Sequence, residues 1–355
     1  MITNLRLQQF RSYQDSTFDF KEGVNIIAGP NASGKTNILE AILFSTQGKS
    51  YRAKDIELIK DGMDWARLDT IFGGKPRTVK IIKDGQTSKK SFDIEGKKHT
   101  RLSYKTTIPV VMFEPNHLLM LSGSPELRRA FLDALIEQTD SAHTTVVNNY
   151  KRALLQRNRL IKNRGQSMKN QLFVWDIRLS ELGAQLVTAR HKIIDQINQQ
   201  LSHTYSNLAG ATSELTASYS NPTEPEAYAS YLLKRLEKDL ELDCLRGYTG
   251  AGPHREDIVF SLNARPLAVS ASRGEARTTL LALKTIELNM IENTRATKPI
   301  LLLDDVFSEL DGLRRQSLTA FITTHQTFIT TTDADIAKRR AGHDTNLIKL
   351  PTTKE

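Results

Sequence analysis

The sequence predicts a mixed α/β protein with a mostly helical second lobe, and three observations lead to this prediction. Residues 24–28 (VNIIA) are an apolar run typical of a buried strand, and a glycine-containing turn and a helix-like segment follow them. Residues 125–208 contain little glycine, and their apolar side chains recur at intervals of three and four, as in helices. From residue 257 onward, strand-like and helix-like segments alternate again. We therefore expect a helical lobe inserted between two parts of an α/β lobe.

Each predicted element rests on its own local pattern. Residues 2–10 alternate apolar and polar side chains, as a half-buried strand does, and turns such as Gly73-Gly74 separate the strand-like segments that follow. The predicted strands are 2–10, 24–28, 66–72, 78–83, 91–94, 108–113, 213–219, 257–262, 300–303, 327–332 and 345–350, and the helices outside the helical block are 36–44, 226–240, 274–292 and 312–322. The lobe boundaries that follow are 1–113 and 226–355 for the α/β lobe and 114–225 for the helical lobe.

Length, charge and cysteine content narrow the class of protein. The 355 residues correspond to roughly two domains, at about 150 residues each. The net charge of +9 favours a polyanionic partner, although simple solubility explains it equally well. The single cysteine, Cys244, can form no internal disulfide, which fits a reducing cytoplasm. No apolar run reaches the ~18 residues of a membrane span, so we expect no membrane partner.

Residues 29–36 match the phosphate-loop motif G-x-x-x-x-G-K-[ST], between an apolar strand and a helix as the motif requires. Glycines let backbone N–H groups converge on phosphates, and the helix N-terminus favours an anion. Lys35 would reach the β- and γ-phosphates of ATP, and Thr36 would ligate Mg²⁺. The predicted nucleotide-binding residues are Gly29, Pro30, Asn31, Ala32, Ser33, Gly34, Lys35 and Thr36.

The apolar run 300–303 ends in two acids, which is the pattern of a Walker B strand. Parallel sheets bind ligands at the carboxyl ends of their strands, so the acids would lie beside the phosphate loop. Asp304 would hold Mg²⁺ through water, and Asp305 would orient or deprotonate the attacking water.

The segment Ser272-Arg273-Gly274-Glu275 precedes a helix and permits two interpretations. Ser272 and Glu275 have the spacing of a helix capping box. The segment also lies about 30 residues before the Walker B strand, where ABC-type ATPases keep a Leu-Ser-Gly-Gly-Gln signature loop. In that interpretation Ser272, Arg273 and Gly274 would meet the γ-phosphate bound by a second copy, in an ATP-sandwiched dimer, and 308–311 would be the loop that crosses the interface.

Further motifs, in a fixed order, resemble the RecF family of bacterial DNA replication and repair proteins over nearly the whole chain. They include Gly123-Ser124-Pro125-Glu126-Leu127-Arg128-Arg129 and Gly252-Pro253-His254-Arg255-Glu256-Asp257. The resemblance implies an ABC/SMC-type P-loop ATPase head without a long coiled coil. It implies weak DNA-stimulated hydrolysis of ATP, ATP-dependent homodimers, and binding to gapped DNA or to single-/double-strand junctions. It further implies partnership with RecO and RecR in loading RecA, and a link to the SOS response.

Several basic residues are candidates for DNA or nucleotide contact. Residues 151–164 hold six basic residues and no acid, and on a helix Leu154, Leu155 and Ile161 would face inward. A solvated basic face explains the pattern as well as phosphate contact does. The candidate DNA-binding residues are Lys151, Arg152, Arg157, Arg159, Lys162 and Arg164, and Arg11 and Arg52 are candidates for nucleotide contact.

Three alternatives to an ATP-dependent DNA-binding dimer remain open at this point. The Walker motifs also occur in an ABC-type ATPase subunit of another complex and in a metabolic P-loop kinase. A DNA scaffold that does not hydrolyse ATP is the third. In addition, 330–333 (TTTD) stands where related ATPases carry a switch histidine.

Overall fold

The computed structural model describes residues 1–163, 168–305, 322, 324–332 and 345–351. The chain forms two compact units. Unit 1 comprises 1–115 and 287–355, and unit 2 comprises 116–286. Within the described ranges, no helix combines the length and the apolar character needed to span a bilayer.

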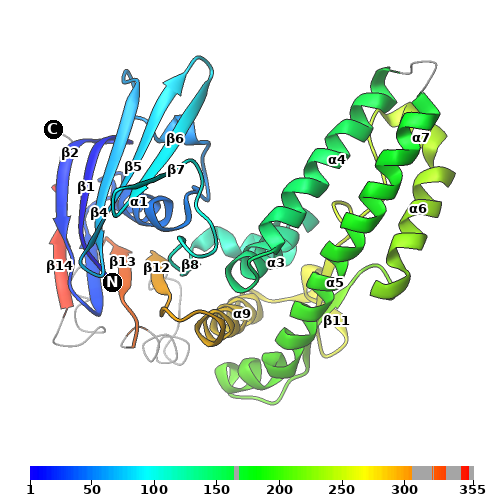
Figure 1. The fold of residues 1–355 in the computed structure, drawn as a ribbon. Helices are drawn as coiled ribbons and strands as arrows, with labels where there is room; N and C mark the ends of the chain where they lie inside the picture. The colour runs from blue at the N-terminus through cyan, green and yellow to red at the C-terminus, as the bar shows by residue number, and fades with distance from the viewer. Residues whose placement is uncertain (164–167, 306–321, 323, 333–344, 352–355) are drawn as a thin grey trace. The chain divides into compact units, whose positions relative to one another are not determined.

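A parallel sheet at the centre of unit 1 has the strand order β14-β3-β13-β12-β8. Its strands are β3 (Val24–Ala28), β8 (Val110–Phe113), β12 (Ile300–Asp304), β13 (Thr327–Thr331) and β14 (Thr345–Lys349). Every residue of β3 is buried, as expected of an apolar run with both faces covered. Helix α1 (Lys35–Gln47), labelled in Figure 1, follows β3 through the glycine-containing turn.

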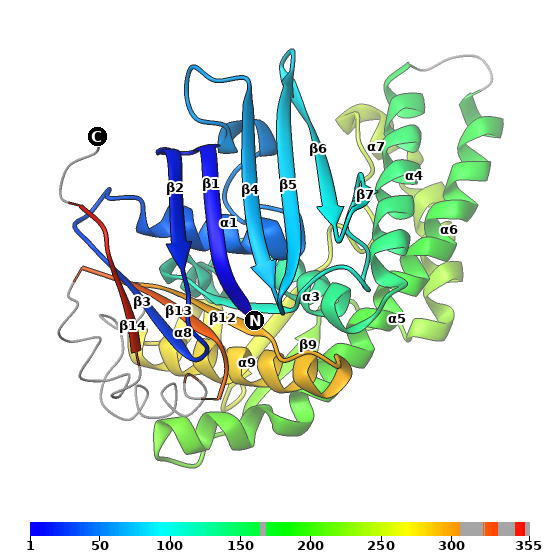
Figure 2. The same cartoon turned by 60° about the vertical axis from the view of Figure 1, so that its left-hand side comes forward.

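Unit 1 also contains an antiparallel sheet of order β2-β1-β4-β5-β6-β7, and Figure 2 shows its strands side by side in this order. Its strands are β1 (Ile2–Phe10), β2 (Tyr13–Asp19), β4 (Trp65–Phe72), β5 (Lys75–Asp84), β6 (Thr87–Ile94) and β7 (Lys97–His99). Alternate residues such as Leu5, Leu68 and Val79 are fully buried, and they share one apolar core with α1 and with Ile27 and Leu302 of the parallel sheet. This core fixes the start of α1, where the phosphate-loop motif lies.

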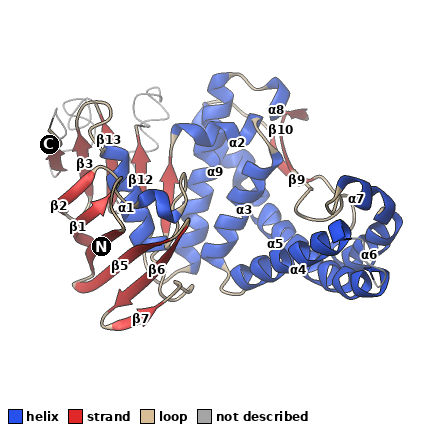
Figure 3. Ribbon diagram, turned by 90° about the horizontal axis from the view of Figure 1, so that it is seen from above, coloured by secondary structure: helices blue, strands red, loops and turns tan. Residues whose placement is uncertain are grey.

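Unit 2 is mostly helical. Its main helices are α3 (Pro125–Thr139), α4 (His143–Asn163), α5 (Met168–Ala209), α6 (Tyr228–Lys238) and α7 (Leu240–Arg246), and α9 (Arg273–Thr294) continues from unit 2 into unit 1. Short helices α2 (Leu119–Ser122) and α8 (Leu267–Ser270) and a small sheet of β9 (Leu215–Tyr219), β10 (Ile258–Leu262) and β11 (Arg265–Pro266) complete it. Helices α4, α5 and α6 lie side by side (Figure 3), and their facing side chains form a core.

The structure differs from the predicted lobes at one boundary. We expected the helical lobe to end at residue 225, but unit 2 extends to residue 286. The reason is packing, because Tyr228, Leu232 and Leu236 of α6 are buried in one core with α4 and α5, and because β10 pairs with β9. Strand β2, with four exposed residues among seven, has no apolar pattern and was not predicted. The predicted helix 312–322 lies almost entirely outside the described residues.

Candidate nucleotide-binding site

The predicted phosphate loop connects the carboxyl end of β3 to the first turn of α1. Gly34, at the N-cap of α1, has φ +96°, which favours glycine. A Cβ at Gly34 would come 2.7 Å from the Tyr13 hydroxyl, which itself donates to the Gly34 carbonyl at 3.2 Å. The loop therefore needs glycine here for its backbone angle and for the close approach of Tyr13.

Two side chains of the loop, Lys35 and Ser33, indicate a ligand site. The Lys35 ammonium donates to the carbonyls of Gly29 and Pro30, both at 2.8 Å. Burial lowers the pKa of Lys35, while the charges of Asp305 and Asp304 act in the opposite direction. The Ser33 hydroxyl is buried and has no hydrogen-bond partner. The loop thus holds the Lys35 ammonium and a hydroxyl without a partner, and both groups can bind phosphate oxygens.

Asp304 lies beside Thr36, although the two are 268 positions apart in the sequence. The Thr36 hydroxyl donates to Asp304 Oδ1 at 3.0 Å. The register of the parallel sheet explains the meeting, since β12 and β3 both pair with β13 and their carboxyl ends share one edge. The sheet thus brings together the two predicted magnesium ligands.

Thr330 is a residue of this centre to which the sequence analysis gave no role. Its hydroxyl donates to Asp304 Oδ1 at 2.6 Å and accepts from the Asp305 backbone N–H at 3.0 Å. Asp305 has φ +51°, an uncommon backbone angle for a side chain with a Cβ. Thr330 therefore holds one acid by its side chain and the other by its backbone. Its signals in the sequence were the end of a predicted strand and the place of 330–333, where related ATPases carry a switch histidine.

The donor set fits Mg²⁺. The Thr36 hydroxyl and the Asp304 carboxylate supply hard oxygen ligands, which this ion prefers, and leave room for water and phosphate oxygens. When bound there, the ion would neutralise charge on the phosphates. Thr330 would keep the Asp304 carboxylate turned toward Thr36.

The candidate arginines Arg11 and Arg52 converge on Glu40, a fully buried side chain of α1. Arg11 binds both carboxylate oxygens of Glu40, at 2.8 and 2.9 Å, and Arg52 donates to the same carboxylate at 3.0 Å and to Asn37 at 2.7 Å. Although burial opposes it, these hydrogen bonds lower the pKa of Glu40. Both arginines thus pair with a buried acid one turn beyond the loop.

The segment 272–275 lies in unit 2, at the start of α9. The Ser272 backbone N–H donates to the Glu275 carboxylate at 2.7 Å, and the Glu275 N–H donates to the Ser272 hydroxyl at 3.2 Å. These hydrogen bonds lower the pKa of Glu275. The capping box is thus present. Ser272 and Arg273 are also exposed, as contact with a second copy would require. Residues 308–311 lie outside the described residues.

The predicted basic face on α4 needs two corrections. Lys151, Arg152, Arg159 and Lys162 are exposed, and Arg164 lies outside the described residues. Arg157 was predicted to contact DNA, but it is fully buried and pairs with Asp176 at 2.5 Å and Asp243 at 2.6 Å. Leu155 was expected to face inward, but it is 54% exposed. Both errors arise because the buried side of α4 is centred on Tyr150, Ala153 and Arg157.

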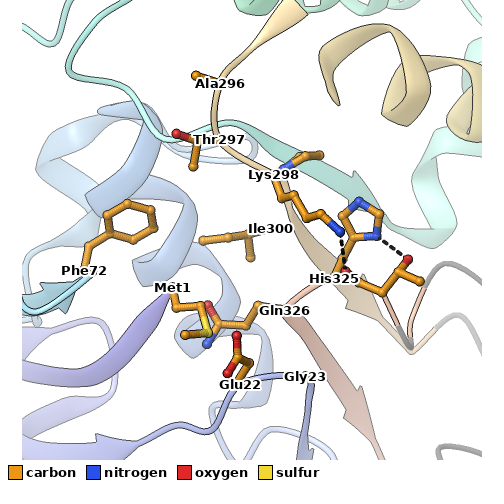
Figure 4. Close-up of a pocket in the computed structure, with 12 residues that line it drawn as sticks. Met1, Glu22, Gly23, Phe72, Ala296, Thr297, Lys298, Ile300, His325 and Gln326 are labelled. Atoms are coloured by element: carbon orange, nitrogen blue, oxygen red, sulfur yellow. Dashed lines mark hydrogen bonds between the residues drawn. The ribbon is translucent and has the colours of Figure 1, made fainter. Parts of the chain in front are cut away.

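A pocket of about 570 Å³ occupies the opposite edge of the parallel sheet (Figure 4). Gly23, Ile300 and Gln326 line it, at the amino ends of β3, β12 and β13. The phosphate loop follows the carboxyl end of β3. The pocket is therefore separate from the candidate nucleotide site.

The parallel sheet, the phosphate loop and the paired Thr36 and Asp304 define a P-loop ATPase head, a class that proteins of several families share. The profile of the family described as "RecF/RecN/SMC N terminal domain" matches residues 1–349. Proteins called "DNA replication and repair protein RecF" from Desulfitobacterium hafniense (strain DSM 10664 / DCB-2) and Bacillus subtilis (strain 168) are each 35% identical to this chain. These alignments cover 95% and 94% of this chain and the same shares of the relatives. The chain belongs to the RecF family.

Solved structures agree with this assignment. One described as "Structure of the recombination mediator protein RecF-ATPrS in RecFOR pathway" superimposes with a TM-score of 0.86 at 29% identity, covering 98% of this chain and 96% of that one. An Smc head bound to part of ScpA shares the fold, with a TM-score of 0.53 at 18% identity, over 94% of this chain and 90% of that one. The predicted fold class, an ABC/SMC-type ATPase head with a mostly helical second lobe, is confirmed, and the described residues contain no long coiled coil.

Proposed function

We propose that this chain binds Mg²⁺ and ATP at residues 29–36 and hydrolyses ATP slowly. The 3.0 Å hydrogen bond between Thr36 and Asp304 carries the proposal, because it joins the two magnesium ligands at the phosphate loop. Lys35 would leave the carbonyls of Gly29 and Pro30 for the β- and γ-phosphates. Asp305 would orient or deprotonate the attacking water. A relative's structure described with ATP supports ATP as the nucleotide.

ATP would also join two copies of the chain. Ser272, Arg273 and Gly274 would contact the γ-phosphate held by the second copy, and the N-terminus of α9 would favour that anion. The exposure of Ser272 and Arg273 supports this role, since neither is enclosed by its own unit. Arg52 would reach the nucleotide only by giving up its hydrogen bonds to Glu40 and Asn37.

The biological role that we propose is ATP-dependent DNA repair in the cytoplasm. The names of the relatives, and a neighbour called a recombination mediator in the "RecFOR pathway", support it. The dimer would bind gapped DNA or a single-/double-strand junction and help to load RecA together with RecO and RecR. DNA would stimulate the weak ATPase. Lys151, Arg152, Arg159 and Lys162 are the exposed α4 residues that would contact phosphates.

Light scattering with Mg²⁺ and ATP tests the dimer. The wild-type chain should double in mass, whereas Ser272→Arg should stay monomeric and still bind ATP. Ser270→Arg, which changes an exposed serine two residues away, is the matched control and should dimerise. A wild-type chain that binds ATP and stays monomeric would contradict the sandwich.

DNA binding is tested with gapped, single-stranded and duplex oligonucleotides, with and without ATP, over a series of salt concentrations. We expect ATP to raise the affinity and salt to lower it steeply, since the proposed contacts are to phosphates. No binding to any of these DNAs at low salt would refute the repair role and leave the ATPase unaffected.

A further inference from the structure

The segment 249–257 in unit 2, which contains the Gly-Pro-His-Arg motif, is anchored at nearly every residue. At its start, Thr249 donates from both its backbone and its hydroxyl to Asn158, at 2.8 and 2.7 Å, and accepts from buried Arg157 at 2.8 Å. The Gly250 N–H donates to Asp243 at 2.8 Å. The first turn of the segment is thus bound to side chains of α4 and α7.

The middle and the end of the segment are held as firmly. His254 bridges Tyr150, at 2.7 Å, and the Thr249 carbonyl, at 3.1 Å. Gly252 has φ +126°, and a Cβ there would lie 2.6 Å from the Tyr150 hydroxyl. The Glu256 carboxylate accepts from Tyr219, Asn221 and Tyr228, each at 2.7 Å, and Arg128 pairs with Asp257.

Arg255 is the exception in this segment. Its side chain is exposed and makes no hydrogen bond or ion pair with any described residue. The guanidinium instead lies over the ring of Tyr248, 4.6 Å from its centroid, and that side chain is 42% exposed. Stacking of this kind restricts a guanidinium while its N–H donors stay available. A rigid segment therefore presents one ordered cation to solvent.

Two more cations lie beside this stacked pair. A Cβ built on Gly250 would come 3.1 Å from Arg246 Nη1, so Arg246 borders the segment, and one built on Gly247, the residue before Tyr248, would come 3.9 Å from Lys162 Cε. Both side chains are exposed. The Asp243 carboxylate, which also lies near Gly250, is buried and already paired with Arg157. Positive charge here has no acidic partner among the described residues.

We propose that Lys162, Arg246, Tyr248 and Arg255 form a phosphate-binding platform for the DNA backbone, with Arg255 as its ordered centre. Arginine suits phosphate oxygens because its planar donors can bind two of them together. Tyr248 is a positioning residue, because it orients Arg255 without adding charge. The platform rests on the proposed function, and it extends the proposed α4 contacts at Lys162 by three residues that lie outside α4.

Fluorescence anisotropy of a labelled 30-base-pair duplex on the full chain with ATP tests the platform. Arg255→Gln should weaken binding roughly fivefold to tenfold at low salt and reduce the slope of log K against log salt by about 0.9. Tyr248→Leu should weaken binding about twofold with an unchanged slope, since no charge is lost. Arg178→Gln, which removes an equal charge from an exposed site on α5, should bind as wild type does.

The controls separate the possible failures. Arg255 makes no hydrogen bond through its side chain to described residues, so the melting temperature of Arg255→Gln should match that of wild type. If wild type binds DNA and Arg255→Gln matches Arg178→Gln in affinity and slope, the platform is refuted and the proposed function stands. If wild type binds no DNA at all, the proposed function fails together with the platform.

Discussion

The phosphate loop of unit 1 and the segment 249–257 of unit 2 each contain a glycine at positive φ, Gly34 in the first and Gly252 in the second. They differ in how many of their polar groups lack a hydrogen-bond partner. In the phosphate loop, the Ser33 hydroxyl has no partner, and the Lys35 ammonium donates to carbonyls of its own loop. In 249–257, almost every polar group meets a buried partner. The first loop is chemically incomplete without a ligand, and the second is complete in itself. Substitutions in the first should therefore change the binding and hydrolysis of ATP, and substitutions in the second should change the free energy of unfolding.

The largest expected effect is on the stability of unit 2. Arg157→Ala leaves the carboxylates of Asp176 and Asp243 buried without their cation. Loss of one partner from a buried ion pair costs about 3–5 kcal/mol, so the free energy of unfolding measured in urea should fall by that amount. Arg159→Ala, two residues along α4 and exposed, should change it by less than about 0.5 kcal/mol. Equal effects of the two substitutions would contradict the burial of Arg157.

The next effect is on the chemistry of unit 1. Thr330→Val removes the hydroxyl that holds Asp304 and the Asp305 backbone. Loss of such a supporting hydrogen bond to a metal ligand typically costs 10–100-fold, and we expect a fall of about that size in the rate of ATP hydrolysis. Thr330→Ser keeps the hydroxyl and should restore most of the rate. A rate for Thr330→Val equal to wild type would show that Thr330 does not position the acids.

Acid should weaken unit 2 before it weakens unit 1. Burial lowers the pKa of His254 from 6.5 to about 4. Between these pH values the His254 imidazole is protonated in the unfolded chain and neutral in the folded chain. Its contribution to the free energy of unfolding is therefore fully present above pH 6.5 and is lost as the pH falls toward 4. From pH 7 to pH 5, His254 should account for a drop of about 2 kcal/mol in the free energy of unfolding. Burial also lowers the pKa of His117 in unit 2, so His254→Gln should reduce the total drop by about 2 kcal/mol without abolishing it, and an unchanged drop would show that His254 does not contribute.

The smallest effect concerns the start of α9. Ser272→Ala removes the hydroxyl that accepts from the Glu275 N–H, and loss of such a cap costs about 1 kcal/mol. Thermal unfolding should reveal this loss without any change in ATP binding by the monomer. A larger loss would mean that the segment supports more of unit 2 than the first turn of α9.

The elements of the ATPase head were predictable because each has a local signal. The apolar run of β3, the phosphate loop and the two acids at the end of β12 are each contained in a short segment. Parallel pairing then dictates that Thr36 and Asp304 meet at one sheet edge. The match to the family confirms the predicted fold class.

Arg157 and Thr330 were not predictable, for a common reason. Arg157 stands in a run of basic residues that resembles an exposed face, and its partners Asp176 and Asp243 are 19 and 86 residues away in the sequence. Thr330 meets Asp304 only because β13 pairs with β12. Long-range contacts decided both roles, and no local pattern encodes them.

Calorimetric titration of the whole chain with ATP and Mg²⁺ tests the central claim, that the phosphate loop of unit 1 is a nucleotide site. The wild-type chain should bind one ATP per copy. Lys35→Ala should weaken binding by about 10–100-fold, the value of a charged hydrogen bond, whereas Lys21→Ala, an exposed lysine of the same unit, should bind as wild type does. Equal affinities of Lys35→Ala and wild type would contradict the account.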